Sequence, residues 1–140
     1  MLDFRFKVLS MLRARVVLII QLVALVGLGL AYFIQPHQMA NLSGMLLMAP
    51  AAATDMRAFY GGLQIGLAAF IGVSLSRLDL TRAALTLLVL LYSSMALARM
   101  GGLWLDGGAQ QTFNLYALLL EVVSVVLCFW ALRGLPRTQP

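Results

Sequence analysis

Long apolar runs, separated by short polar segments, occur along almost the whole chain. A helix that crosses the hydrocarbon core of a bilayer needs about 20 mostly apolar residues. Four stretches of this kind occur, at residues 16–34, 56–76, 83–100 and 112–132. They predict an all-α bundle of four transmembrane helices, forming a single integral membrane domain over residues 1–140. The connections between them are too short to hold a soluble domain.

The composition favours a membrane protein over a soluble one. Of the 140 residues, 62% are hydrophobic and 11% are charged, whereas soluble domains are about 45–50% apolar and about 25% charged. The single cysteine, Cys128, excludes an internal disulfide framework and a cysteine-rich zinc site. The first apolar stretch is longer than the core of a signal peptide, which spans about 7 to 15 residues, so we expect an uncleaved anchor.

The distribution of basic residues predicts the orientation of the bundle. Most of them precede the first span, lie in the second connection or follow the fourth span: Arg5, Lys7, Arg13, Arg15, Arg77, Arg82, Arg133 and Arg137. Only Arg57 and Arg99 lie on the other side. By the positive-inside rule, both termini are expected in the cytoplasm and the protein in a bacterial inner membrane. Orientation accounts for the net charge of +5, so we expect no nucleic-acid partner.

Prolines divide the first connection, residues 35–55. Pro36 is expected to end the first helix, and Pro50 to break whatever follows the apolar middle of the connection. Because this middle is too short to cross a bilayer, it predicts a short helix at the outer membrane interface. Thr54 or Asp55 is expected to cap the second span.

Glycines mark the third connection, where they flank Trp104: Gly101, Gly102, Gly107 and Gly108. Trp104 there suits the headgroup region of the bilayer. The second connection is short, which predicts that the second and third spans are antiparallel neighbours.

Glu121 is the chain's only glutamate and lies in the middle of a predicted span. It is about ten residues into the fourth span, roughly 15 Å below the outer border at about 1.5 Å per residue. An ionisable side chain at this depth costs about 2.5 to 3.5 kcal/mol on insertion scales, so it should face the bundle interior and have a partner. Asn114 shares its face of the helix.

The second span carries a matching polar face. Arg57, Gly61 and Gln64 follow the i, i+4, i+7 spacing of one helix face. Tyr60 lies one turn above Gln64, and Gln64 is roughly level with Glu121 by helix rise. Three glycines are expected to let a neighbouring helix approach closely, two of them in a GxxxG pair: Gly61, Gly62 and Gly66.

The third span contributes Arg99 and, on the same face, Tyr92. Arg99 and Glu121 are about 10 to 12 Å apart vertically and their side chains lean toward one another, so they can meet if the two helices adjoin. These positions predict a polar pocket, open toward the periplasm, that binds a small or lipid-like anionic molecule. Its expected lining is Arg57, Tyr60, Gln64, Tyr92, Arg99, Asn114 and Glu121.

Glu121 has two further interpretations, as a structural link that fixes helix register and as a catalytic group. The single histidine shows no Ser/His/Asp arrangement, and the single glutamate cannot supply paired intramembrane carboxylates. We therefore favour a non-enzymatic protein without cofactor or metal. Methionines and His37 on the outer side are ligand types that suit Cu(I), but irregular spacing favours ordinary packing.

The run Thr54-Asp55-x-Arg57-x-x-Tyr60-Gly61-Gly62-x-Gln64-x-Gly66-Leu67, followed by Glu121, resembles a bacterial family of small four-helix membrane proteins classed as a domain of unknown function. The chain is also loosely similar to DoxX-like four-helix proteins. The first resemblance covers nearly the whole chain and implies a four-span inner-membrane fold, but no activity. It marks as family-pattern positions Arg57, Tyr60, Gly61, Gly62, Gln64 and Glu121.

Two functions follow from the sequence. The first is a protein that binds a small or lipid-like molecule in the polar pocket, with transport as one use of such binding. The second is a non-enzymatic accessory subunit of a larger membrane complex, or a homo-oligomeric scaffold, that packs through its glycine-rich helix face. In both, the lipid bilayer is the principal partner.

Overall fold

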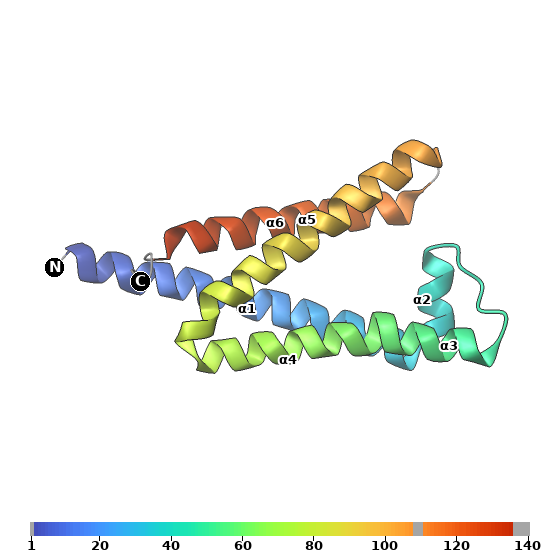
Figure 1. Ribbon diagram of the computed structural model, residues 1–140, viewed down its shortest axis with the longest axis horizontal. Helices are drawn as coiled ribbons and strands as arrows, with labels where there is room; N and C mark the ends of the chain where they lie inside the picture. The colour runs from blue at the N-terminus through green and yellow to red at the C-terminus, as the bar shows by residue number, and fades with distance from the viewer. Residues whose placement is uncertain (1, 108–110, 136–140) are drawn as a thin grey trace. The chain divides into compact units, whose positions relative to one another are not determined.

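The computed structural model describes residues 2–107 and 111–135, and these residues form helices joined by short connections (Figure 1). The elements are α1 (Leu2–Ile34), α2 (Pro36–Leu42), α3 (Pro50–Met56), η1 (Arg57–Gly62), α4 (Leu63–Ser76), η2 (Leu78–Leu80), α5 (Thr81–Leu105) and α6 (Thr112–Gly134). The predicted all-α fold class is confirmed. The sequence-based expectations for Gly108 and Arg137 lie outside the described residues.

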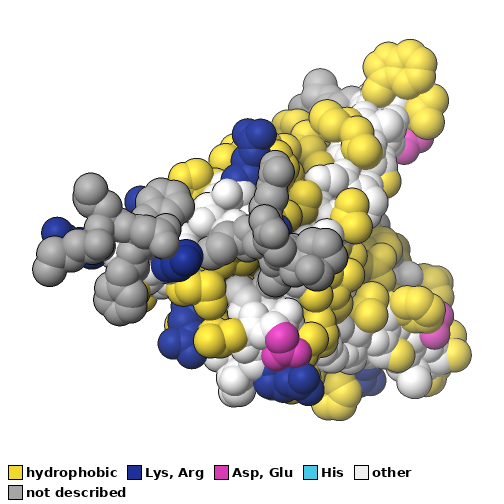
Figure 2. Space-filling view, turned by 60° about the vertical axis from the view of Figure 1, so that its left-hand side comes forward, with side chains coloured by type: hydrophobic (Ala, Val, Ile, Leu, Met, Phe, Trp, Pro, Cys, Tyr) yellow, Lys and Arg dark blue, Asp and Glu magenta, His cyan; other side chains and the backbone are white. Residues whose placement is uncertain are grey.

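Among the described residues, four helical segments are long and apolar enough to cross a membrane: Lys7–Ile34, Pro50–Ser76, Leu78–Leu105 and Thr112–Gly134. Large apolar side chains on them, such as Val23, Leu90 and Val126, are at least 60% exposed. Lipid tails are as apolar as these side chains, so a bilayer can cover them. Figure 2 shows apolar side chains over much of the surface in view. The chain is therefore a multi-pass membrane protein by helix length and composition.

The chain divides into two compact units, which are described separately. Unit 1 comprises Met1–Ile19 and Val73–Pro140, and unit 2 comprises Ile20–Gly72. Helices α1 and α4 each contribute to both units. The single domain over residues 1–140, the cytoplasmic termini and the exact spans stay predictions.

Unit 1 is built on the pair of helices α5 and α6, which pack together. Its core includes the fully buried Leu85, Leu88 and Cys128. Two arginines hold helix ends, since Arg15 donates to the Leu75 carbonyl (3.2 Å) and Arg82 to the Leu135 carbonyl (3.0 Å). The Leu75 carbonyl lies in the last turn of α4 and the Leu135 carbonyl just after α6, where intrahelical donors run out, and the arginines supply donors there.

Unit 2 has a small apolar core where α1 ends and α2 and α3 begin. Tyr32, Ala40 and Met56 form this buried cluster, with Met39 and Leu47 packed against it. The first connection holds a short helix as predicted, α2 (Pro36–Leu42), although this helix ends within the apolar middle of the connection. Helix α1 ends before Pro36, also as predicted. Proline disfavours helix in the residue before it, which separates α1 from α2.

The second long helix begins six residues before the predicted span. The helix begins at Pro50 rather than at residue 56, and Pro50 occupies its first turn. Proline is favoured there because its fixed φ suits a helix and the N–H it lacks would have no intrahelical partner. The expected cap by Thr54 or Asp55 is wrong: Ala49 is the N-cap residue, and the Thr54 hydroxyl donates to the Pro50 carbonyl inside the helix.

The third connection is shorter than predicted, because α5 continues to Leu105. Gly101, Gly102 and Trp104 are therefore helical, and their assignment to a connection is wrong. The chain reverses at Gly107, whose φ of +78° is the left-handed conformation that glycine adopts readily after a helix. Glycine in a helix is unfavourable by only about 1 kcal/mol relative to alanine. The apolar residues on either side can therefore keep α5 helical through Gly101 and Gly102.

Candidate functional site

A buried ion pair in unit 1 joins Arg99 of α5 to Glu121 of α6. The guanidinium contacts both carboxylate oxygens, with Nε at 3.1 Å from Oε1 and 3.2 Å from Oε2, and Nη2 at 2.8 Å from Oε1. The Glu121 side chain is 6% exposed and that of Arg99 23% exposed. A forked, charge-assisted pair of this geometry is strong and directional. It therefore links α5 to α6 at these two positions.

Two amides extend this pair into a network. Nη1 of Arg99 donates to Oδ1 of Asn114, and Nδ2 of Asn114 donates to Oε1 of Gln111 at 2.7 Å. The sequence prediction omits Gln111, although its i, i+3 spacing from Asn114 is a signal for such a pair. Tyr92, the other predicted member from α5, is half-buried. The carboxylate of Glu121 thus already has the cationic partner that its burial requires.

In unit 2, the predicted polar face begins in a π-helical turn, η1, over Arg57–Gly62. π-helical turns are rare and are often found at functional sites. The i, i+4, i+7 spacing assigned to Arg57, Gly61 and Gln64 assumes 3.6 residues per turn, and the wider turn changes that alignment. A run of residues with an ordinary helical period gives no sign of such a turn.

Arg57 and Tyr60 each contact the end of α1. Nε of Arg57 donates to the Phe33 carbonyl at 3.0 Å, in the last turn of α1, where a cation is favoured by the helix dipole. The ring of Tyr60 lies against that of Tyr32, with centroids 5.1 Å apart and planes tilted by 30°. These contacts position both side chains at the junction of α1 and η1.

Gln64, one turn further along, has an incompletely satisfied side chain. Its Oε1 atom is buried and, within the part of the chain that the structure describes, accepts no hydrogen bond. Buried polar atoms are nearly always hydrogen-bonded, so an exception calls for an explanation, such as a bound molecule or a water. Gln64 is thus the position in unit 2 where a donor is missing.

The close approach of helices in unit 2 occurs at Gly29 and Gly61. A Cβ atom added to Gly29 would lie 3.0 Å from the Gly61 carbonyl oxygen and 2.9 Å from Cγ1 of Ile65. A Cβ atom at Gly62 would meet only its own helix, at 3.7 Å, and one at Gly66 would meet nothing within 4 Å. The contact therefore uses Gly61 of the three predicted packing glycines, together with Gly29, which the prediction omits.

In the structure, the seven predicted pocket residues fall into two groups, one in each unit. Arg99, Asn114 and Glu121 are hydrogen-bonded in unit 1, on the same two helices as Tyr92. The other three, Arg57, Tyr60 and Gln64, lie along one continuous stretch of helix in unit 2. One pocket formed by all seven stays a prediction.

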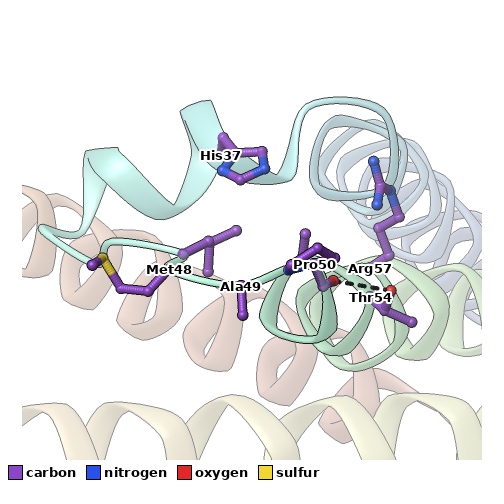
Figure 3. A pocket seen from close by; sticks show the side chains of 8 residues that line it. His37, Met48, Ala49, Pro50, Thr54 and Arg57 are labelled. Atoms are coloured by element: carbon purple, nitrogen blue, oxygen red, sulfur yellow. Dashed lines mark hydrogen bonds between the residues drawn. The ribbon is translucent and has the colours of Figure 1, made fainter.

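A cavity of about 460 Å³ also lies in unit 2, where α2 faces the start of α3 (Figure 3). Its polar lining is His37, Thr54 and Arg57. The sequence indicates Arg57 as a site residue, but His37 only as a weak metal-ligand candidate and Thr54 only as a cap. The fold of the first connection, which brings His37 near Arg57, leaves no periodic signal in the sequence.

These features define a small multi-pass membrane protein with a closed ion-pair network in unit 1 and an incompletely satisfied polar helix in unit 2. Residues 13–132 match the family model of the Domain of unknown function (DUF4345). Because the match covers most of the chain, the protein belongs to this family. No curated protein and no solved structure matches the chain.

Proposed function

We propose that the chain is a small, non-enzymatic protein of the bacterial inner membrane that binds a small or lipid-like anionic molecule in a polar pocket facing the periplasm. Under this proposal both termini are cytoplasmic and α2 lies at the outer interface. The Arg57-x-x-Tyr60-Gly61-Gly62-x-Gln64 run would be a motif of the family, in a bundle organised as in DoxX-like proteins. Transport of the bound molecule is one use of such a pocket.

The observation that carries the proposal is the buried Oε1 of Gln64, which accepts no hydrogen bond from the described residues. An amide oxygen buried without a donor is unfavourable by about 1–3 kcal/mol, and more where water is absent. A bound molecule that offers an N–H or O–H group would remove this penalty. The π-helical turn just before Gln64 supports a binding role for the same segment.

Arg57 supplies the positive charge for an anionic molecule. Its Nε atom is engaged by the Phe33 carbonyl, which fixes the guanidinium in place without neutralising it. The ion pair of Glu121 with Arg99 makes Glu121 a structural link in this proposal rather than a ligand contact. Of the interpretations that the sequence leaves open, this proposal takes Glu121 as a structural link. It assigns binding to Arg57, Tyr60 and Gln64.

We expect the substitution Gln64→Leu to lower occupancy of the bound molecule about tenfold, because it removes one hydrogen-bond acceptor from a buried site. Native mass spectrometry of the protein extracted with its own lipids measures this occupancy. The control is Gln38→Leu, the same exchange at an exposed position of unit 2. Equal occupancy in wild type and both variants, or no bound species in any of them, would contradict the proposal.

The exposed glycines favour a second candidate, the accessory subunit or homo-oligomeric scaffold. Gly62 and Gly66 are exposed and have room for an added Cβ atom, so the helix of another chain can approach them closely. The same spectra test this candidate. An oligomer or a bound protein that dissociates in Gly66→Leu, without loss of any small molecule in Gln64→Leu, would favour assembly over binding.

A further inference from the structure

The cavity in unit 2 has one polar side and one apolar side. His37 extends from α2 above the segment that contains Met48, Ala49 and Pro50, and the guanidinium of Arg57 lies beside the same space (Figure 3). The apolar lining consists of Leu47, Met48, Ala49, Pro50 and Ala53. A molecule that fills this cavity therefore meets polar and apolar surfaces at once.

The polar side offers hydrogen-bond donors and no carboxylate. Among the described residues, neither the terminal nitrogens of Arg57 nor the His37 ring has a hydrogen-bonding or ion-pair partner, and no Asp or Glu lines the cavity. The hydroxyl of Thr54 donates to the Pro50 carbonyl at 3.2 Å, so recognition depends on Arg57 and His37. A fixed guanidinium with free N–H groups is well suited to an oxyanion.

The cavity lies where two candidate spans end. His37 follows the span Lys7–Ile34 by three residues, and Arg57 is seven residues into the span Pro50–Ser76, about 10 Å along the helix at 1.5 Å per residue. Helix ends of transmembrane segments lie near the boundary between hydrocarbon and headgroups. Phosphate groups of lipids are concentrated at that boundary.

We propose that this cavity binds a phosphate-type oxyanion between Arg57 and His37, with the apolar wall at residues 47–50 and 53 covering the adjoining part of the molecule. The oxyanion belongs either to a phospholipid headgroup or to free phosphate. This inference deepens the proposed function and rests on it, because Arg57 belongs to both. It adds the class of ligand and names His37 as a contact.

The chain's single histidine makes the test specific. Full-length protein carrying ¹⁵N-labelled histidine, purified without a histidine tag in a nonionic detergent, gives one set of imidazole NMR signals, from His37. Three probes are titrated: dioleoylphosphatidylglycerol, inorganic phosphate, and dioleoylglycerol, which has the same chains without phosphate. We expect a saturable shift of the His37 signals with phosphatidylglycerol and none with dioleoylglycerol.

The inorganic phosphate arm distinguishes the sources of the oxyanion. A shift with phosphatidylglycerol alone assigns the cavity to a lipid headgroup, and a matching shift with inorganic phosphate shows that the free anion suffices. The absence of a shift with both phosphate probes, or an equal shift with dioleoylglycerol, overturns the inference. If Gln64→Leu nevertheless loses its bound species in the mass spectra, the proposed function stands and only the phosphate site is rejected.

Substitution of the guanidinium provides the second readout. We expect Arg57→Gln to weaken phosphatidylglycerol binding about tenfold, and Arg77→Gln, which removes an exposed arginine of unit 1, to leave it unchanged within about twofold. Because Arg57 also caps α1, Arg57→Lys is measured as well: it keeps the positive charge but lacks the planar fork, so a weakening intermediate between wild type and Arg57→Gln is expected. Unchanged binding in both Arg57 variants would overturn the inference.

Discussion

Replacing Arg99 by leucine should destabilise the α5–α6 pair by about 3 kcal/mol, since it leaves a buried carboxylate without its partner. Glu121 is 5% exposed, and both of its carboxylate oxygens accept hydrogen bonds from Arg99. Removing both charges in Arg99→Leu/Glu121→Leu should restore most of the loss, because two apolar side chains of similar size carry no desolvation penalty. The free energy of unfolding is measured by SDS titration in mixed micelles.

The chain provides both a signal and a control for this test: its two tryptophans give the signal, and an exposed ion pair gives the control. Both tryptophans, Trp104 and Trp130, are on the α5–α6 pair, so their fluorescence reports on its separation. The control is Arg77→Leu, which breaks an exposed pair with Asp79 of nearly the same length, 2.9 Å. Exposed pairs contribute about 0–1 kcal/mol, so little change is expected. Equal effects of Arg99→Leu and Arg77→Leu would refute the structural role of Glu121.

The second large effect is expected at Gly29. Gly29→Ala should destabilise unit 2 by about 2 kcal/mol. The new methyl group would overlap the Gly61 carbonyl and Ile65, and would force α1 away from the helix that contains these two residues. A Cβ atom at Gly29 would lie 3.0 Å from the Gly61 carbonyl oxygen and 2.9 Å from Cγ1 of Ile65, which leaves no space for the methyl group. The loss is measured as the shift of the unfolding midpoint in mixed micelles.

Gly27→Ala is the matched control in the same helix. A Cβ atom at Gly27 would meet nothing within 4 Å, so the substitution should be neutral or stabilising by about 0.4–1 kcal/mol through reduced flexibility of the unfolded chain. The two variants should therefore differ in sign. If both stabilise the protein equally, α1 does not pack closely on Gly61.

Apolar length and helix rise were sufficient to predict much of the fold. A run of about 20 apolar residues forms a spanning helix in lipid whatever its neighbours, because backbone groups must pair within the segment. The sequence also predicts that Glu121 has a partner and that Arg99 can reach it if the two helices adjoin, and the structure shows this pair. A short helix in the first connection was expected because its apolar middle is too short to cross a bilayer, and the structure has one at Pro36–Leu42.

The missed features depend on tertiary packing or on a departure from the ordinary helical period. The GxxxG pattern draws attention to Gly62 and Gly66, but only the packing shows that Gly61 and Gly29 make the close contact. The π-helical turn over Arg57–Gly62 changes which side chains share a face. His37 lines the cavity because of the way the first connection folds. The spacing of residues along the sequence does not predict this fold.

Under the proposed function, the Glu121 ion pair holds two helices together while the polar groups of unit 2 bind the ligand. The most direct test of this assignment is the occupancy of the bound molecule, by native mass spectrometry, in Arg99→Leu/Glu121→Leu compared with Gln64→Leu. We expect occupancy near that of wild type in the double variant, whose substitutions lie in unit 1, and about tenfold lower occupancy in Gln64→Leu. Loss of the bound molecule from the double variant together with retention in Gln64→Leu would contradict this assignment.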